Sequence, residues 1–175
     1  MDILLQILTY TVPSLLVLVV AYFTLHLVFK NEEKRRRYEL FKANVSLVTP
    51  VRLTAYERLV LFLERISPDS LMIRVQDSSL TAGQFHSFLL ATVRSEYEHN
   101  LSQQVYVSRE AWTLVKNAKE SMIQLINTSS SRVPPQVPSL ELAKVILETY
   151  QSTDSDTPTV FAINFIKGEV KQYFG

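Results

Sequence analysis

The sequence predicts a mainly α-helical protein, with an N-terminal transmembrane helix followed by a cytoplasmic helical bundle. An apolar run from Ile3 to Phe29 contains no Asp, Glu, Lys or Arg, and a basic segment follows it at once. Several later segments repeat apolar residues at three- and four-residue spacing, which is typical of amphipathic helices. No segment combines sustained strand alternation with the turn residues of a hairpin.

Residues 1–30 are predicted to form the transmembrane helix. A span of about 30 Å of hydrocarbon needs about 20 helical residues, and Val12 to Phe29 supplies eighteen that the preceding apolar residues can extend. Twelve of these eighteen are Leu, Val or Phe, which favours insertion by roughly 4–7 kcal/mol. A cleaved signal peptide has a basic start and a shorter apolar core, so we expect this segment to be retained.

Residues 31–48 are predicted to form a basic juxtamembrane stalk. Residues 30–42 carry six basic and three acidic side chains. Lys and Arg stay on the cytoplasmic side of a membrane, so the N-terminus is expected outside and the C-terminal domain in the cytoplasm, at a bacterial inner membrane. The residues expected at the lipid surface, where anionic headgroups attract cations, are Lys30, Lys34, Arg35, Arg36 and Arg37.

Residues 49–128 are predicted to form a helical core domain. Thr49-Pro50 is expected to separate it from the stalk, and apolar stripes predict helices over 53–66, 81–99 and 108–127. Ser108 is placed to cap the third of these helices. The short run Leu71–Val75 fits either a helical turn or a strand, and Val105–Val107 is expected to be buried.

Residues 129–138 are predicted to be a Pro/Ser linker, and residues 139–175 a C-terminal helical pair that packs on the core. Proline lacks an N–H and restricts the residue before it to extended geometry. Ser139 is expected to cap the first helix of the pair. A polar stretch at 151–156 follows, and Thr157-Pro158 is a typical start for the last helix.

Composition excludes several classes of function. The chain has no cysteine, which removes disulfides, thiolate catalysis and Cys-based zinc sites. It has three glycines, too few for the phosphate-binding loops of kinases, P-loop NTPases and dinucleotide-binding folds. The net charge of +1, concentrated beside the span, does not predict nucleic-acid binding. No cofactor is expected.

One polar cluster could carry chemistry. Glu96 and His99 have the Glu-x-x-His spacing that di-iron bundles use twice, but here it occurs once. The alternative interpretation is that the amides satisfy backbone groups where a helix ends, and we predict no catalytic or metal-binding residue. The cluster comprises Arg94, Glu96, Glu98, His99, Asn100, Gln103 and Gln104.

The segments Arg52–Pro68 and Arg94–Ser108, followed by Ala111-Trp112, resemble an uncharacterised Bacteroidetes family of single-pass membrane proteins. The resemblance covers the span through about Ile126 and implies a membrane anchor with a helical cytoplasmic part. It transfers no activity. We therefore expect an anchored interaction or scaffold protein, whose partners are the lipid bilayer and an unidentified protein. The alternative is an enzyme or metal-binding protein that uses the Glu96/His99 region. Self-association is also expected, because the helices at 53–66 and 158–174 carry more apolar surface than one small bundle hides.

Overall fold

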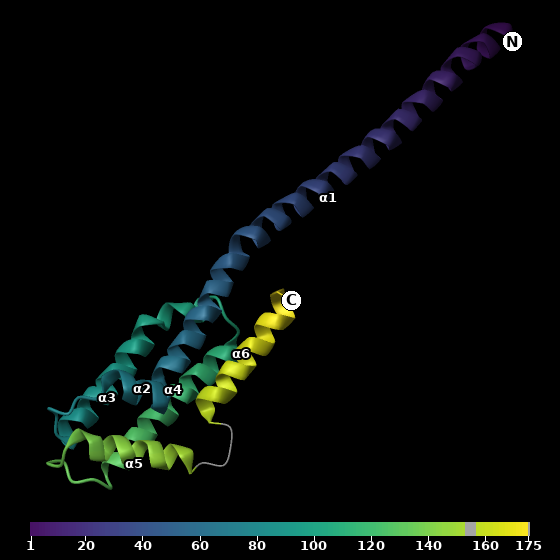
Figure 1. Cartoon of the computed structure of the whole chain (residues 1–175). Helices are drawn as coiled ribbons and strands as arrows, with labels where there is room; N and C mark the ends of the chain where they lie inside the picture. The colour runs from purple at the N-terminus through teal and green to yellow at the C-terminus, as the bar shows by residue number, and fades with distance from the viewer. Residues whose placement is uncertain (153–156, 175) are drawn as a thin grey trace. The chain divides into compact units, whose positions relative to one another are not determined.

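The computed structural model describes residues 1–152 and 157–174, without the side chains of residues 2, 4–6, 8, 10–12 and 14. This part of the chain contains six α-helices and one 3-10 helix, and its β-pairing is limited to an isolated bridge between Thr81 and Pro138. The mainly helical fold is confirmed. The chain divides into two compact units, Met1–Thr49 and Pro50–Gly175 (Figure 1). Part of the polar stretch predicted at 151–156 lies outside the described residues.

Helix α1 (Asp2–Ile66) is continuous across the boundary between the two units (Figure 1). The prediction that a separate helix begins at Leu53 is therefore wrong, although the boundary between the two units does lie at Thr49-Pro50. A proline inside a helix removes one backbone hydrogen bond, at about 3 kcal/mol, and regular turns continue on both sides of Pro50. In the following turn, the Thr54 hydroxyl donates to the Pro50 carbonyl at 3.0 Å.

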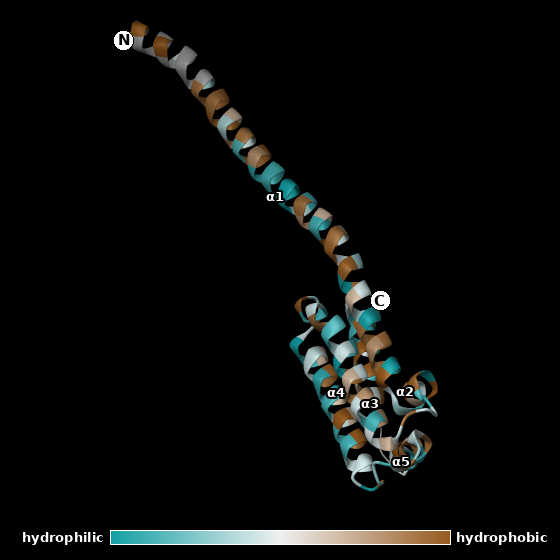
Figure 2. Cartoon of the chain, turned by 90° about the vertical axis from the view of Figure 1, so that its left-hand side faces the viewer, coloured by the Kyte–Doolittle hydropathy of each residue, from teal (hydrophilic) through white to brown (hydrophobic). Residues whose placement is uncertain are grey.

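The first unit consists of α1 alone, and its apolar residues are open to the surroundings. The large apolar side chains from Leu15 to Phe29 are 40–69% exposed. Figure 2 shows this hydrophobic part of α1 giving way to a hydrophilic segment. Within the described residues, α1 is one helix that is long and apolar enough to cross a membrane. Length and composition alone support this assignment.

The second unit is a bundle built around α4 (Arg109–Ser130). Helices α3 (Ala82–His99) and α6 (Pro158–Phe174) pack along α4, and α5 (Ser139–Gln151) lies across one end of the bundle, where it contacts both α3 and α4 (Figure 1). The last turns of α1 complete the core. The two remaining elements are α2 (Pro68–Val75) and the 3-10 helix η1 (Leu101–Val105).

The core follows the predicted stripes closely. On α1, the buried side chains at three- and four-residue spacing are Tyr56, Leu59, Phe62, Leu63 and Ile66. On α4 they are Ala111, Val115, Ala118, Met122 and Ile126. Such one-sided burial is what sets the three- and four-residue period.

Two local expectations need correction, and one open alternative is decided. Helix α4 continues to Ser130, three residues beyond the predicted end. Within the segment 105–107, Val105 and Tyr106 are 75% and 39% exposed rather than buried, at the point where η1 ends. Leu71–Val75, which fitted either a helical turn or a strand, belongs to helix α2.

The predicted caps had different outcomes. Ser108 caps α4, and its hydroxyl accepts from the backbone N–H of Ala111 at 3.0 Å. Ser139 does not cap α5, because the cap position is Pro138. The buried Ser139 hydroxyl instead donates to the Asp77 carbonyl at 2.6 Å, so it ties α5 to the loop before α3.

The segment 131–138 is attached to the start of α3. Ala82 N–H donates to the Val137 carbonyl at 2.8 Å, and Gly83 N–H donates to the Pro135 carbonyl at 3.0 Å. A Cβ at Gly83 would lie 3.2 Å from Pro135 Cβ, so the absence of a side chain there permits the close approach. These contacts fix the path of the segment that joins α4 to α5.

Candidate functional site

Glu96 is the best-connected member of the predicted polar cluster. Its Oε1 lies 2.7 Å from Arg65 Nη2 and 3.0 Å from Arg74 Nη1. The Glu96 side chain is 17% exposed, whereas those of Arg65 and Arg74 are 43% and 34% exposed. Arg74 also donates to the Arg65 carbonyl at 3.3 Å. The carboxylate that the sequence paired with His99 therefore joins α1, α2 and α3.

The other members of the cluster do not bond to the Glu96 carboxylate. Asn100 is buried, and its Nδ2 donates to the Glu96 carbonyl at 2.8 Å, while buried Gln103 donates to the Ser102 hydroxyl at 3.3 Å. Among the described residues, no three His, Cys, Asp or Glu side chains are arranged to hold a metal ion. The exposed members are Arg94, Glu98, His99 and Gln104.

The predicted membrane-surface residues all lie on α1 with exposed side chains. Arg35 pairs with Glu39 at 3.0 Å, and Arg37 pairs with Glu33 at 2.6 Å. Both pairs are four residues apart, and such exposed pairs contribute only a few tenths of a kcal/mol to helix stability. The five basic residues in this exposed stretch are Lys30, Lys34, Arg35, Arg36 and Arg37.

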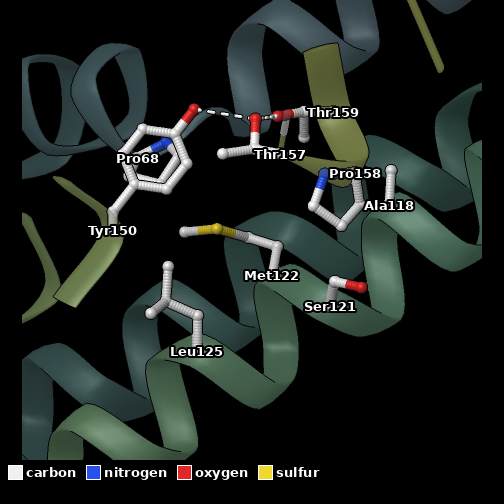
Figure 3. A pocket seen from close by; sticks show the side chains of 9 residues that line it. All are labelled: Pro68, Ala118, Ser121, Met122, Leu125, Tyr150, Thr157, Pro158 and Thr159. Carbon is white, nitrogen blue, oxygen red and sulfur yellow. Dashed lines mark hydrogen bonds between the residues drawn. The ribbon is translucent and has the colours of Figure 1, made fainter. Parts of the chain in front are cut away.

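A small apolar pocket of about 130 Å³ lies between α4, the end of α5 and the start of α6 (Figure 3). Met122 and Leu125 form its apolar wall. At its rim, the Tyr150 hydroxyl lies 3.2 Å from Thr157 Oγ1, which lies 3.2 Å from Thr159 Oγ1. Its lining within the described chain contains no charged side chain, so this pocket offers space for a small apolar group but no acid or base.

A larger groove of about 530 Å³, here called the α1–α6 groove, lies between the last turns of α1 and helix α6. Leu61 is 57% exposed beside it. Its lining is mostly apolar, with two acids on α1 and one lysine on α6. The residues are Leu53, Tyr56, Glu57, Val60, Leu61, Glu64, Ile166, Lys167 and Val170.

A second hollow, here called the α4–α6 hollow, has a volume of about 500 Å³ and a lining of mixed polar and aromatic residues. Glu169 in its wall is 8% exposed, and its Oε2 is buried without a hydrogen-bond partner among the described residues. The residues that line the hollow are Ser108, Glu110, Phe165, Gly168, Glu169, Gln172 and Tyr173.

Tyr56 is buried near Glu169, and its buried hydroxyl also lacks a hydrogen-bond partner among the described residues. Burial raises the pKa of Tyr56, and the negative charge of Glu169 raises it further, while Arg52 acts in the opposite direction. The Arg52 guanidinium lies 5.3 Å from the centre of the Tyr173 ring, and its Nε donates to the Tyr106 carbonyl at 3.1 Å. Acidic, aromatic and basic side chains thus meet where α1, α4 and α6 come together.

The sequence interpretation missed this second hollow, because α6 was read as an apolar core helix. The sequence nevertheless contained a signal of a buried acid on α6. Ala162, Ile166 and Glu169 follow one another at four- and three-residue spacing on the buried face of α6. An acid at a core position of an apolar stripe is uncommon unless it is paired.

Comparison with known proteins gives one match. The sequence model of a family of unknown function, DUF7935, matches residues 2–173. No curated protein and no solved structure matches the chain. Because the match spans nearly the whole chain, the protein belongs to this family.

Proposed function

We propose that this member of the DUF7935 family is a single-pass protein of the inner membrane of a Bacteroidetes bacterium, and that it presents a helical interaction domain to the cytoplasm. The observation that carries the proposal is the exposed apolar surface of α1 between Leu15 and Phe29, followed directly by Lys30 and further basic residues. A helix that is apolar on every side needs an apolar environment on every side. Lipid supplies that environment without a protein partner.

Charge sets the proposed orientation. The basic residues after the span resist translocation, so they hold the following chain on the cytoplasmic side. Each cation near an anionic headgroup adds roughly 1 kcal/mol of attraction. The six basic residues of 30–42 exceed the three acidic ones, so the local field favours lipid contact.

The anchoring is tested by fractionation and by a topology reporter. The protein should stay in the membrane pellet after an alkaline carbonate wash, and a C-terminal reporter that is active only in the cytoplasm should be active. Changing Arg35, Arg36 and Arg37 to Glu should lower reporter activity, whereas the matched control of Lys167→Glu and Lys171→Glu should leave it unchanged. Release of the wild-type protein into the supernatant of the carbonate wash would refute the proposal. Activity of a C-terminal reporter that works only outside the cytoplasm would also refute it.

The α1–α6 groove supports the proposed interaction role. An apolar groove between two helices suits an amphipathic helix of a partner protein. Glu57 and Glu64 are seven residues apart, so they lie on the same face of α1 two turns apart. We therefore propose that the partner helix places basic residues opposite these two acids and apolar residues against Leu61.

Site-specific crosslinking tests this interaction. A photoreactive residue at Leu61 should crosslink a protein through a helical segment with basic residues at matching spacing, and Glu57→Lys with Glu64→Lys should abolish the crosslink. The matched control places the photoreactive residue at Ile73, which is 88% exposed on α2. Equal products from both positions would contradict a specific groove. A crosslink to a second copy of the chain would replace the proposed partner with self-association.

A further inference from the structure

We propose that the part of α1 that follows the basic segment pairs with the same part of a second copy of the chain, as a short parallel two-stranded coiled coil. The inference rests on the proposed membrane anchoring and goes beyond it. The contact surface, here called the stalk stripe, lies within the first unit. It comprises Leu40, Phe41, Asn44, Leu47 and Val48.

The stalk stripe is one face of α1, and it is open to the surroundings. Its members follow the spacing of an apolar helix face, and its four apolar side chains are 49–72% exposed. The opposite face carries the 3.0 Å ion pair between Arg35 and Glu39, followed by Lys42 and Ser46. In Figure 2, hydrophobic residues return on α1 beyond its hydrophilic segment. An exposed apolar face of this kind marks a contact surface.

The position of the stalk stripe along α1 argues against lipid as its cover. Helix α1 is continuous from the span through this segment. Leu40 therefore lies 11 residues beyond Phe29, which is about 17 Å at about 1.5 Å per residue. The headgroup layer of one leaflet is only about 5–8 Å thick. In the anchored protein, the stalk stripe thus lies in water beyond the reach of lipid tails.

Anchoring favours a second copy over other partners. Every anchored copy holds α1 in the same direction and at the same height, so two stalk stripes meet in parallel and in register. Confinement to one membrane also raises the effective concentration of one copy around another. A contact this short needs that assistance, because short helices are marginally stable in water.

Asn44 fits a pair of identical helices. Leu40 and Leu47 are seven residues apart, as successive d positions of a heptad are, and Asn44 lies at the a position between them. An Asn at one a position is unfavourable against an apolar side chain. It can bond to its counterpart in an identical parallel helix, where it fixes both the register and the number of strands.

The charges around this seam permit two identical copies to approach. The residues that flank it, Phe41, Ala43 and Val48, are uncharged. Toward the membrane, the next a position is Arg37, which pairs with Glu33 of its own helix at 2.6 Å. Each copy therefore compensates this charge itself.

Disulfide crosslinking of single-cysteine variants in isolated membranes tests the pairing. Because the chain has no cysteine, a product of twice its mass joins the same position of two copies. With copper phenanthroline as oxidant, Leu40→Cys and Leu47→Cys should each give at least fivefold more of this product than the neighbouring controls on the opposite face, Glu39→Cys and Ser46→Cys. A disulfide requires Cα atoms about 4.4–6.8 Å apart, so products at both leucine positions require parallel helices in register.

Equal product at all four positions would indicate random collision and would overturn the inference, as would a main product whose mass includes a different protein. Absence of the product from protein that stays in the pellet after the carbonate wash would refute the stalk pairing alone. Release of the protein into the supernatant would refute the proposed anchoring, and the stalk pairing with it.

A charge substitution provides a second test. Leu47→Glu, added to Leu40→Cys, should lower the crosslinked product at least fivefold, because the carboxylates of the two copies would meet in the seam. Ser46→Glu in the same background should change it less than twofold. Both substitutions lie at exposed positions of the first unit, so neither should alter the urea midpoint of the bundle. Equal product from both variants would place the contact elsewhere and overturn the inference.

Discussion

Neutralising Glu96 isolates the role of a carboxylate that connects three helices. Glu96→Gln keeps the size of the side chain and one acceptor oxygen, but it removes the negative charge that Arg65 and Arg74 share at 2.7 and 3.0 Å. The two guanidinium groups would then face each other without a counter-ion. We expect the second unit to be less stable as a result.

The expected loss is about 2 kcal/mol. A hydrogen bond to a charged group contributes roughly 1.5–3 kcal/mol when it is buried, whereas an exposed ion pair contributes about 0.2–1 kcal/mol. Glu96 is 17% exposed, but the arginines are 43% and 34% exposed, so water screens both pairs in part. For a unit of this size, 2 kcal/mol corresponds to a decrease in Tm of roughly 8 °C.

Tryptophan fluorescence in urea measures this loss. The chain has one tryptophan, and Trp112 stacks on Tyr97 with the ring centres 5.5 Å apart, so its emission reports unfolding of the second unit. Combining Glu96→Gln with Arg74→Gln should give a coupling energy of about 1 kcal/mol, and Glu98→Gln should change stability by less than about 0.5 kcal/mol. A loss below about 0.5 kcal/mol for Glu96→Gln would refute the reasoning.

Two further changes test the fold in the same urea assay, and a third tests it by alkaline unfolding. Ser139→Ala removes the 2.6 Å hydrogen bond to the Asp77 carbonyl and should destabilise the second unit by about 1–2 kcal/mol; a loss no larger than that of exposed Ser152→Ala would contradict it. Thr81→Ala removes the capping box at the start of α3 and should cost about 1 kcal/mol; equal urea midpoints would exclude this role. Because burial and Glu169 raise the pKa of Tyr56, its contribution is full below its unfolded pKa near 10 and is lost as the pH rises toward the folded value. Tyr56→Phe should therefore move alkaline unfolding to higher pH, and an unchanged alkaline midpoint would contradict this linkage.

One-sided burial explains which parts of the fold the sequence could predict. The stripes on α1 from Tyr56 to Ile66 and on α4 from Ala111 to Ile126 were predictable, because a packed face imposes the helical period on the residues themselves. The continuation of the helix through Pro50 was not predictable. Proline removes one hydrogen bond at one position, and the long helical segments on either side outweigh that loss. The hydrogen bond between Ala82 and Val137 joins segments that are distant in the sequence. Such contacts produce no periodic pattern of residue types, so the sequence did not predict them.

The same distinction applies to the sites. Glu96 attracted attention through its spacing to His99, but its partners Arg65 and Arg74 come from other helices. The spacing of residues along the sequence predicts contacts within one helix. It does not predict contacts between different helices. Glu169 was missed for the opposite reason, since the apolar residues Phe165, Ile166 and Val170 around it suggested a core helix. Only the packing of α6 against α4 and α1 shows that this acid is buried beside Tyr56.

Two apolar surfaces on the single helix α1 require different environments. Between Tyr56 and Ile66, apolar side chains on one face are buried, while Glu57 and Glu64 on another face are exposed. Between Leu15 and Phe29, large apolar side chains are exposed on every face and no charge interrupts them. A protein core can cover one face of a helix, but only a surrounding apolar phase covers all of them. The pattern of apolar residues along α1, more than its length, therefore supports lipid as the environment of the first segment and protein as that of the second.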